Sequence, residues 1–253
     1  MINKKKILEL VNNQLAIDMN CNVEDFSKDG IIYTKFKESS NQRKCIRKTP
    51  YVELITMGKA CIITLDDEIK PIVEKEFKNK TRNEISELNV LTESEIHYIP
   101  DITRITAKRE LPKEFEYEIK EGKDIEQLYK LPQFKGFDNS IQYGENYVGA
   151  DEIVIYAKDG EKIIGMSGAS KDTEEMWQIG VDVKQEYRNK GLATSLVSNL
   201  ANIILEKGKL PYYSTTSSNI PSQLVAYKCG FMPYWYSKKY INNYIFVKKE
   251  NIT

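Results

Sequence analysis

Histidine and cysteine are scarce in this sequence, and neither is arranged for chemistry. His97 is the one histidine among 253 residues. The four cysteines, which never show Cys-x-x-Cys spacing, are Cys21, Cys45, Cys61 and Cys229. This scatter argues against a zinc site and a disulfide framework, so we expect no metal. One histidine also excludes most Ser-His and Cys-His triads unless His97 is itself the base, and its plain surroundings favour a structural role.

The chain also lacks a long apolar run and a net charge. No run approaches the roughly 18 apolar residues that a membrane span needs. The basic start, Met1–Lys6, leads into a stretch that Glu9, Asn12 and Asn13 interrupt, so it lacks the apolar core of a signal peptide. Basic and acidic residues number 37 each, and neither half of the chain has the positive excess of a nucleic-acid binder. We therefore expect a cytoplasmic protein with neither membrane nor nucleic acid as a partner.

Glycine is unevenly distributed along the chain. Of 13 glycines, only Gly30 and Gly58 lie in residues 1–113, which indicates longer elements with fewer tight turns there. Residues 110–114 resemble a linker. We therefore predict two domains: a smaller N-terminal α+β domain of unknown role in residues 1–113, and a second domain in residues 114–253.

Apolar periodicity predicts the elements of the N-terminal part. The predicted helices cover residues 7–15, 69–77 and 81–88. The predicted strands cover residues 31–36, 51–57 and 61–65. Asp66 and Asp67 are favourable N-caps for the second helix. Residues 93–99 fit either type of element.

The second part begins with an alternating strand at residues 115–119 and a helix at 124–131. Residues 132–150 have little periodicity; a loop this long is often functional, and a disordered surface excursion fits equally well. The turn residues Asp159-Gly160 predict a hairpin of strands 153–157 and 162–170. Two last strands are expected at 231–236 and 240–247.

Glycines in the second hairpin strand carry a separate signal. Gly165 and Gly168 interrupt the apolar residues of that strand. Because glycine has no side chain to pack, its presence there indicates a bend or a close approach of other backbone.

A strand-to-helix turn at Tyr187 to Thr194 is the chemically informative stretch. The preceding strand alternates, with apolar residues at Trp177, Ile179, Val181 and Val183. The following helix has one apolar face, formed by Leu192, Leu196, Leu200 and Ile204. Gly191 lets the backbone approach a ligand, and the free N–H groups that begin the helix attract anions, phosphate above all. The charges of Arg188 and Lys190 have the matching sign.

The run Arg188-Asn189-Lys190-Gly191-Leu192-Ala193 resembles the coenzyme A signature of the GNAT acetyltransferase superfamily, Arg/Gln-x-x-Gly-x-Gly/Ala. The downstream order also matches, with a strand at 211–216, then Asn219, a short helix and the pair Gly230-Phe231. The resemblance covers roughly residues 114–248. It implies fold class α/β (α+β), with a mixed, mostly antiparallel sheet and flanking helices. The whole chain resembles bacterial GNAT proteins that carry an extra N-terminal domain.

The resemblance also implies acetyl-CoA as cosubstrate and a place for it. Strands 177–183 and 211–216 would splay apart, and the pantetheine arm would bond to the backbone between them. The pyrophosphate would bind the N–H groups of residues 188–194. The cofactor-binding residues so implied are Val181, Asp182, Val183, Arg188, Asn189, Lys190, Gly191, Leu192, Ala193, Thr194, Asn219 and Ser222.

Direct attack of an amine on the thioester needs a base for the amine and an acid for the thiolate. Many relatives use a Glu on the strand before the signature as the base. Glu174, Glu175 and Asp182 are candidates here, and we select Glu175.

In family members that use a Tyr as the acid, it usually lies seven residues after the Asn; counted from Asn219, that position is Ala226 here. Tyr227 is displaced by one residue, which rotates a helical side chain by about 100°. Tyr227 is nevertheless the candidate acid, and the alternatives nearby are Tyr212, Tyr213 and Tyr234.

The function implied is acetyl-CoA-dependent N-acetylation of a primary amine, by direct transfer to a small-molecule acceptor. The N-terminal domain would then shape or cover the acceptor site. The alternative is a non-catalytic acyl-CoA sensor whose N-terminal half is the output module, since fold alone does not fix function. A homodimer is left open.

Overall fold

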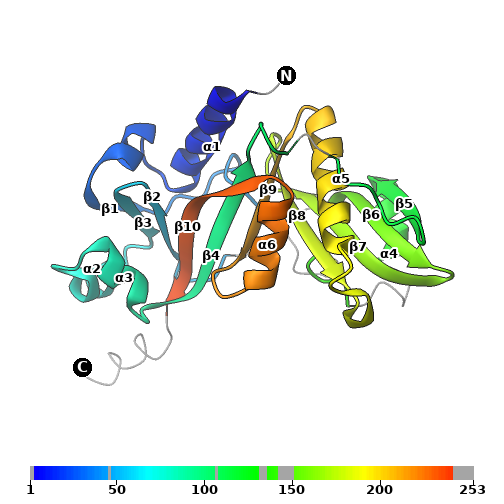
Figure 1. The fold of residues 1–253 in the computed structure, drawn as a ribbon. Coiled ribbons are helices and arrows are strands. Elements are labelled where there is room, and N and C mark those ends of the chain that lie inside the picture. Colours follow the sequence, from blue (N-terminus) through cyan, green and yellow to red (C-terminus); the bar gives the residue numbers. More distant parts are fainter. Residues whose placement is uncertain (1–2, 45–46, 106–107, 131–135, 142–150, 242–253) are drawn as a thin grey trace.

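The computed structural model describes residues 3–44, 47–105, 108–130, 136–141 and 151–241 (Figure 1). Within these residues one 10-stranded sheet has the order β1-β3-β2-β10-β4-β9-β8-β7-β6-β5. Neighbouring strands are antiparallel except for the parallel pairs β1–β3 and β8–β9. The predicted mixed, mostly antiparallel sheet with flanking helices is therefore confirmed.

The strands are β1 (Gly30–Lys35), β2 (Val52–Met57), β3 (Ala60–Leu65), β4 (Leu91–Pro100), β5 (Glu116–Glu121), β6 (Asp151–Asp159), β7 (Lys162–Lys171), β8 (Met176–Val183), β9 (Leu210–Thr216) and β10 (Phe231–Ile241). The helices are α1 (Lys4–Asp18), α2 (Lys70–Phe77), α3 (Arg82–Glu87), α4 (Lys123–Leu128), α5 (Leu192–Glu206) and α6 (Ile220–Lys228). The described residues also include the short 3-10 helices η1 (Val23–Ser27) and η3 (Gln185–Tyr187).

Helices cover both faces of the sheet (Figure 1). Adjacent strand residues divide between the faces: Tyr213 packs in the core under α5 and α6, whereas Tyr212 packs in the core under α1. Likewise Tyr236 belongs to the core of α2 and α3, and Trp235 to that of α1. Helices α2, α3, α5 and α6 thus share one face. The opposite face carries α1 and, at the other end of the sheet, α4 with Phe137.

The local predictions for the N-terminal part are confirmed, except for one helix cap. Asp66 and Asp67 do not cap α2, whose N-cap is Ile69. The Asp66 carboxylate instead accepts a hydrogen bond from the backbone N–H of Tyr51 at 2.7 Å, which fastens the start of β2. The ambiguous residues 93–99 are part of strand β4.

Two predictions for the second part are changed or fall outside the description. The predicted break at residues 237–239 is wrong: residues 231–236 and 240–241 lie in one continuous strand, β10, which has a bulge between Pro233 and Trp235. Residues 242–247 lie outside the described residues, as does most of the predicted loop at 132–150. The hairpin of β6 and β7 is confirmed.

The predicted domain boundary does not coincide with a break in the sheet. Strand β4 lies between β9 and β10, and β2 pairs with β10 on the other side. One apolar cluster joins Val11 and Leu15 of α1 to Leu210 and Trp235. The division at residue 114 therefore stays a prediction about folding units.

Within the described residues, no helix combines the length and apolarity required to span a membrane.

Candidate functional site

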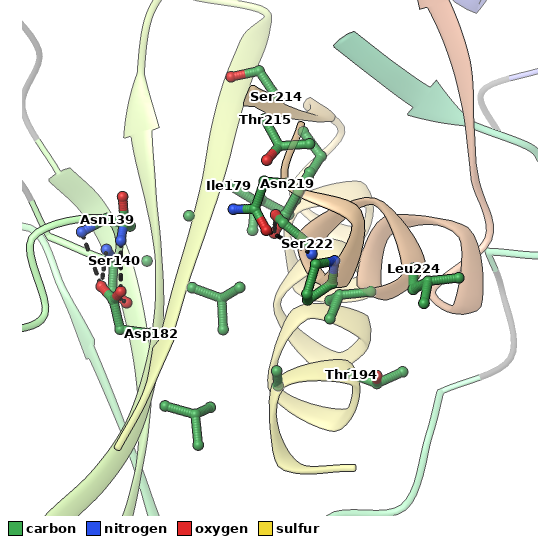
Figure 2. A pocket seen from close by; sticks show the side chains of 18 of the residues that line it. Asn139, Ser140, Ile179, Asp182, Thr194, Ser214, Thr215, Asn219, Ser222 and Leu224 are labelled. Carbon is green, nitrogen blue, oxygen red and sulfur yellow. Dashed lines mark hydrogen bonds between the residues drawn. The ribbon is translucent and has the colours of Figure 1, made fainter. Parts of the chain in front are cut away.

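A cleft opens where strands β8 and β9 separate. Their parallel pairing runs from Met176 and Leu210 to Ile179 and Tyr213 and stops there. Beyond that point β8 pairs only with β7, and β9 only with β4. The splayed strands that the resemblance implies are thus present, and a cavity of about 1010 Å³ lies between them (Figure 2).

One end of the cleft is the N-terminus of α5. Asn189 and Gly191 have φ of 63° and 82°, which turns the chain sharply into the helix. Ser195 N–H makes the first helical bond, to the Gly191 carbonyl at 3.0 Å, so residues 192–194 present N–H groups without helical partners. A Cβ on Gly191 would meet nothing within 4 Å. Open space, free N–H groups and the helix dipole together suit an anion.

The two cations of the signature contact the surrounding turn. Arg188 donates from Nε to the carbonyl oxygen of Val183 at 3.0 Å. The backbone N–H of Arg188 donates to the carbonyl oxygen of Gln185 at 3.2 Å. That N–H is therefore already occupied, unlike those of residues 192–194. Lys190 lies over the ring of Tyr187 at 5.4 Å and does not line the cleft.

The structure brings the other predicted cofactor residues together. Those that line the cleft are Val181, Asp182, Val183, Arg188, Asn189, Gly191, Leu192, Ala193, Thr194, Asn219 and Ser222. Their roles remain predictions.

Tyr213 begins at the vertex of the cleft, and its hydroxyl reaches α6. It is the last β9 residue paired with β8, its side chain is buried, and its hydroxyl lies 2.7 Å from Oγ of Ser222. Asn219 caps α6 by accepting from the Ser222 N–H at 3.2 Å, which fixes that serine. Burial raises the pKa of Tyr213 to about 12, although the bond with Ser222 lowers it. The hydroxyl therefore keeps its proton at neutral pH and can donate it.

Asp182 holds a turn of chain across the sheet rather than pointing free into the cleft. Its carboxylate accepts four hydrogen bonds: from N and Nδ2 of Asn139 at 2.9 and 2.6 Å, and from N and Oγ of Ser140 at 2.9 and 3.0 Å (Figure 2). Glycines make room for this turn, because a Cβ on Gly168 or Gly180 would lie 1.9 or 1.6 Å from its carbonyl oxygens. The close backbone approach predicted at Gly168 is confirmed.

The two selected catalytic residues lie outside the cleft. Glu175 is exposed ahead of β8, and its Oε1 lies 3.5 Å from Nζ of Lys209. Tyr227 is 56% exposed on α6, with the Arg104 guanidinium 4.2 Å from its ring centre. Ala226, at the position of the relatives' acid, is fully buried in the core under α5. The helix rotation between positions 226 and 227 accounts for the outward Tyr227.

Polar residues that the sequence reasoning did not select line the opposite face of the cleft. Gln178, Ser170 and Ser214 face away from α5, and Glu95 joins them from β4. Gln178 donates from Nε2 to Oγ of Ser214 at 2.6 Å. The alternation of β8 in the sequence is consistent with Gln178 on this polar face. By contrast, the sequence of β4 does not indicate that this strand pairs with β9.

Asp172 lies behind this face and is almost fully buried. It accepts hydrogen bonds from Oγ of Ser170 at 2.9 Å and from the hydroxyl of Tyr212. Burial raises the pKa of the Asp172 carboxyl from 3.8 to about 6, although both hydrogen bonds and the charges of Arg43 and Lys239 lower it. The carboxyl can therefore gain or lose a proton near neutral pH.

A smaller cavity of about 40 Å³ adjoins the cleft and shares Glu95, Gln178 and Ser214 with it. His97 and Glu53 line it, both nearly fully buried. His97 Nδ1 and Glu53 Oε1 have no hydrogen-bond partner within the described residues. Burial, with the charges of Arg43 and Lys239, holds the pKa of His97 well below its ordinary value, so its imidazole is neutral.

Comparison with known proteins gives a family match and similar solved structures. Residues 116–231 match the model of the acetyltransferase (GNAT) family. Among solved structures, the chain resembles an acetyltransferase of the GNAT family from Colwellia psychrerythraea, with 15% identity, a TM-score of 0.46, and 70% of this chain and 76% of that chain covered. A GCN5-related N-acetyltransferase-like protein from Streptococcus suis gives 13% identity, a TM-score of 0.43 and 72% of both chains.

A third structure, a GCN5-related N-acetyltransferase from Sphaerobacter thermophilus, gives 10% identity and a TM-score of 0.47, over 76% of this chain and 60% of that chain. Comparison with curated proteins gives no match.

Proposed function

We propose that this protein acetylates a primary amine of a small molecule, in the cytoplasm, using acetyl-CoA, because residues 116–231 match the model of the acetyltransferase (GNAT) family. The observation that carries the proposal is that one cleft contains both a gap between two strands and an open helix N-terminus. Strands β8 and β9 separate beside the open N-terminus of α5, and the cleft passes from there to a polar face.

The chain's own groups fit the cosubstrate at the anion end. Residues 192–194 would hold the pyrophosphate through their N–H groups, and the bare Cα of Gly191 leaves it room. Backbone groups of Val181 and Val183 would align the pantetheine arm along β8. Acetyl-CoA supplies the thioester, from which the amine takes the acetyl group directly.

Tyr213 is the acid that the geometry favours. It lies at the vertex, lines the cleft and keeps its proton at neutral pH. With the Ser222 hydroxyl donating to its oxygen, Tyr213 would hold its own proton toward the leaving sulfur.

The polar side of the cleft suits a cationic acceptor. Carboxylates of Glu95, Asp138 and Asp151 line the cleft. Opposite charges attract strongly in a partly enclosed site, so an ammonium group would be drawn to this side. Each such contact orients the amine as well as binding it.

A non-catalytic acyl-CoA sensor is the second candidate, because Glu175 and Tyr227 both lie outside the cleft. Binding of acetyl-CoA does not separate the two functions, but turnover does.

Incubating the full chain with acetyl-CoA and a panel of primary amines, while following free thiol, tests the proposal. Amine-dependent thiol release supports the enzyme, provided that Gly191→Asp abolishes it and Asp29→Asn, an exposed change before β1, does not. Tight binding of acetyl-CoA without release by any amine would favour the sensor.

A further inference from the structure

A buried carboxyl, Asp172, lies behind the polar face of the cleft and is bonded directly to one side chain that lines the cleft. Ser170 lines the cleft, and its Oγ donates to Oδ1 of Asp172 at 2.9 Å. Asp172 itself does not line the cleft but lines the small cavity that adjoins it. Ser170 pairs across the sheet with Gln178, one residue before the point where β8 and β9 separate. The serine is therefore the part of this pair that a molecule at the vertex would touch.

The surroundings hold Asp172 in place from three sides. The Tyr212 hydroxyl donates to it and also lies 3.1 Å from Oε1 of Gln178. The backbone N–H of Lys44 donates to the Asp172 carbonyl at 2.9 Å. Arg43, buried against Asp18 at the end of α1, lies over the Tyr212 ring at 5.9 Å. Residues 43 and 44 belong to the N-terminal half, which thus covers the carboxyl.

We propose that Ser170 and Asp172 form a proton relay for the acceptor amine, and that the N-terminal half completes it by burying the carboxyl. The proposal rests on the acetyl transfer inferred above. The N–H bond of the ammonium group breaks and its proton passes to Ser170 Oγ, while the Ser170 hydroxyl proton passes to Asp172. The serine is unchanged, Asp172 gains one proton, and the amine gains the electron pair with which it attacks the thioester.

Titration of Asp172 gives the relay a measurable signature. The groups facing it are Tyr212 of β9, Arg43, and Lys239 of β10. The neighbouring small cavity adds further ionisable residues, namely Asp18, Lys44, Arg47, Tyr51, Glu53, Glu95 and His97. Only the ionised carboxyl accepts a proton. The value of kcat/KM for the amine should therefore fall tenfold per pH unit below about pH 6.

The test uses the full chain, acetyl-CoA and the amine that the panel yields. Asp172→Asn should lower kcat by about 10²- to 10⁴-fold and remove this acidic limb, with KM for acetyl-CoA unchanged. Ser170→Ala should lower kcat similarly. Tyr212→Phe removes a hydrogen bond that stabilises the ionised carboxyl, so the limb should move to higher pH. Asp29→Asn is the matched control.

Three results would overturn the relay: an acidic limb that survives in Asp172→Asn, a loss of less than about tenfold in that variant, or a limb that Tyr212→Phe does not move. If Asp172→Asn does not fold, Ser170→Ala and Tyr212→Phe decide the matter. If no amine is acetylated, the proposed function fails, and carbon-13 NMR of the Asp172 carboxyl judges the pair alone. Titration near pH 6 that moves to higher pH in Ser170→Ala would support the pair, and titration that this variant leaves unchanged would refute it.

Discussion

Two buried ionisable side chains near the cleft make the stability of the fold depend on pH, in opposite directions. Asp172 has a raised pKa, so between about pH 3.8 and 6 the folded chain holds a proton that the unfolded chain releases. Its stabilising contribution is greatest at low pH and is lost as the pH rises through 6. His97 has a depressed pKa, so the unfolded chain binds the extra proton below about 6.5. Its contribution is lost as the pH falls.

The first prediction concerns the stability effect of Asp172→Asn. Relative to the variant, the unmodified protein should lose about 2 to 3 kcal/mol of unfolding free energy between pH 4 and pH 7, from a shift of roughly two pKa units at about 1.4 kcal/mol each. Urea denaturation at several pH values measures this. His97→Gln is a comparison in which the pH dependence should have the opposite direction. The unmodified protein should lose stability relative to this variant as the pH falls. A constant difference between Asp172→Asn and the unmodified protein would contradict the raised pKa.

The second prediction compares two tyrosines. Tyr213→Phe should lower kcat by about 10²-fold or more, because it removes the proton donor at the vertex and retains the ring. Tyr227→Phe should cost less than about tenfold, because that hydroxyl faces outward beside Arg104. Kinetics on the amine found by the panel measure both, with coenzyme A affinity as the check on folding. The reverse order of effects would make Tyr227 the acid.

At the scale of elements, the beginning of α5 is where we expect a single substitution to affect coenzyme A binding most. The third prediction is that Gly191→Asp abolishes coenzyme A binding, since it places an anion where phosphate must approach the N–H groups. Gly191→Ala is the matched control: it has the same strain at a φ of 82° without the charge, and should bind measurably. Arg188→Ala should weaken binding modestly, because backbone groups carry most of the contacts. Isothermal titration decides, and unchanged affinity in Gly191→Asp would remove the site from α5.

Elements were predictable where the signal is local. The alternation of Trp177 to Val183 and the four-residue spacing of Leu192 to Ile204 follow from the burial of one face, so β8 and α5 could be predicted from neighbouring residues. The same holds for the glycine turn between them. By contrast, Asp182 meets Asn139 across 43 residues, and Tyr212 meets Asp172 across 40. No short-range pattern records such pairs, which is why neither the contact of Asp182 with Asn139 nor the buried Asp172 was predicted.

For the whole molecule, the position of β4 decides how the halves relate. A composition shift near residue 114 predicts two domains, yet β4 completes the sheet between β9 and β10. Strand pairing is fixed by complementary surfaces far apart in sequence, and composition does not encode it. The consequence for the site is direct, because Glu95 and the cover over Asp172 both come from the first half.

The last prediction is that the full chain unfolds in one cooperative transition. Leu15 of α1 packs in a cluster with Leu210 and Trp235, and Leu200 of α5 packs in a cluster with Tyr98 of β4. Both leucines are fully buried, so Leu15→Ala and Leu200→Ala should each cost about 2 to 5 kcal/mol. Because each core contains strands from both halves, both variants should shift the same calorimetric peak, with equal calorimetric and van't Hoff enthalpies. Two peaks, of which each variant shifts only one, would instead establish residues 1–113 and 114–253 as independent folding units.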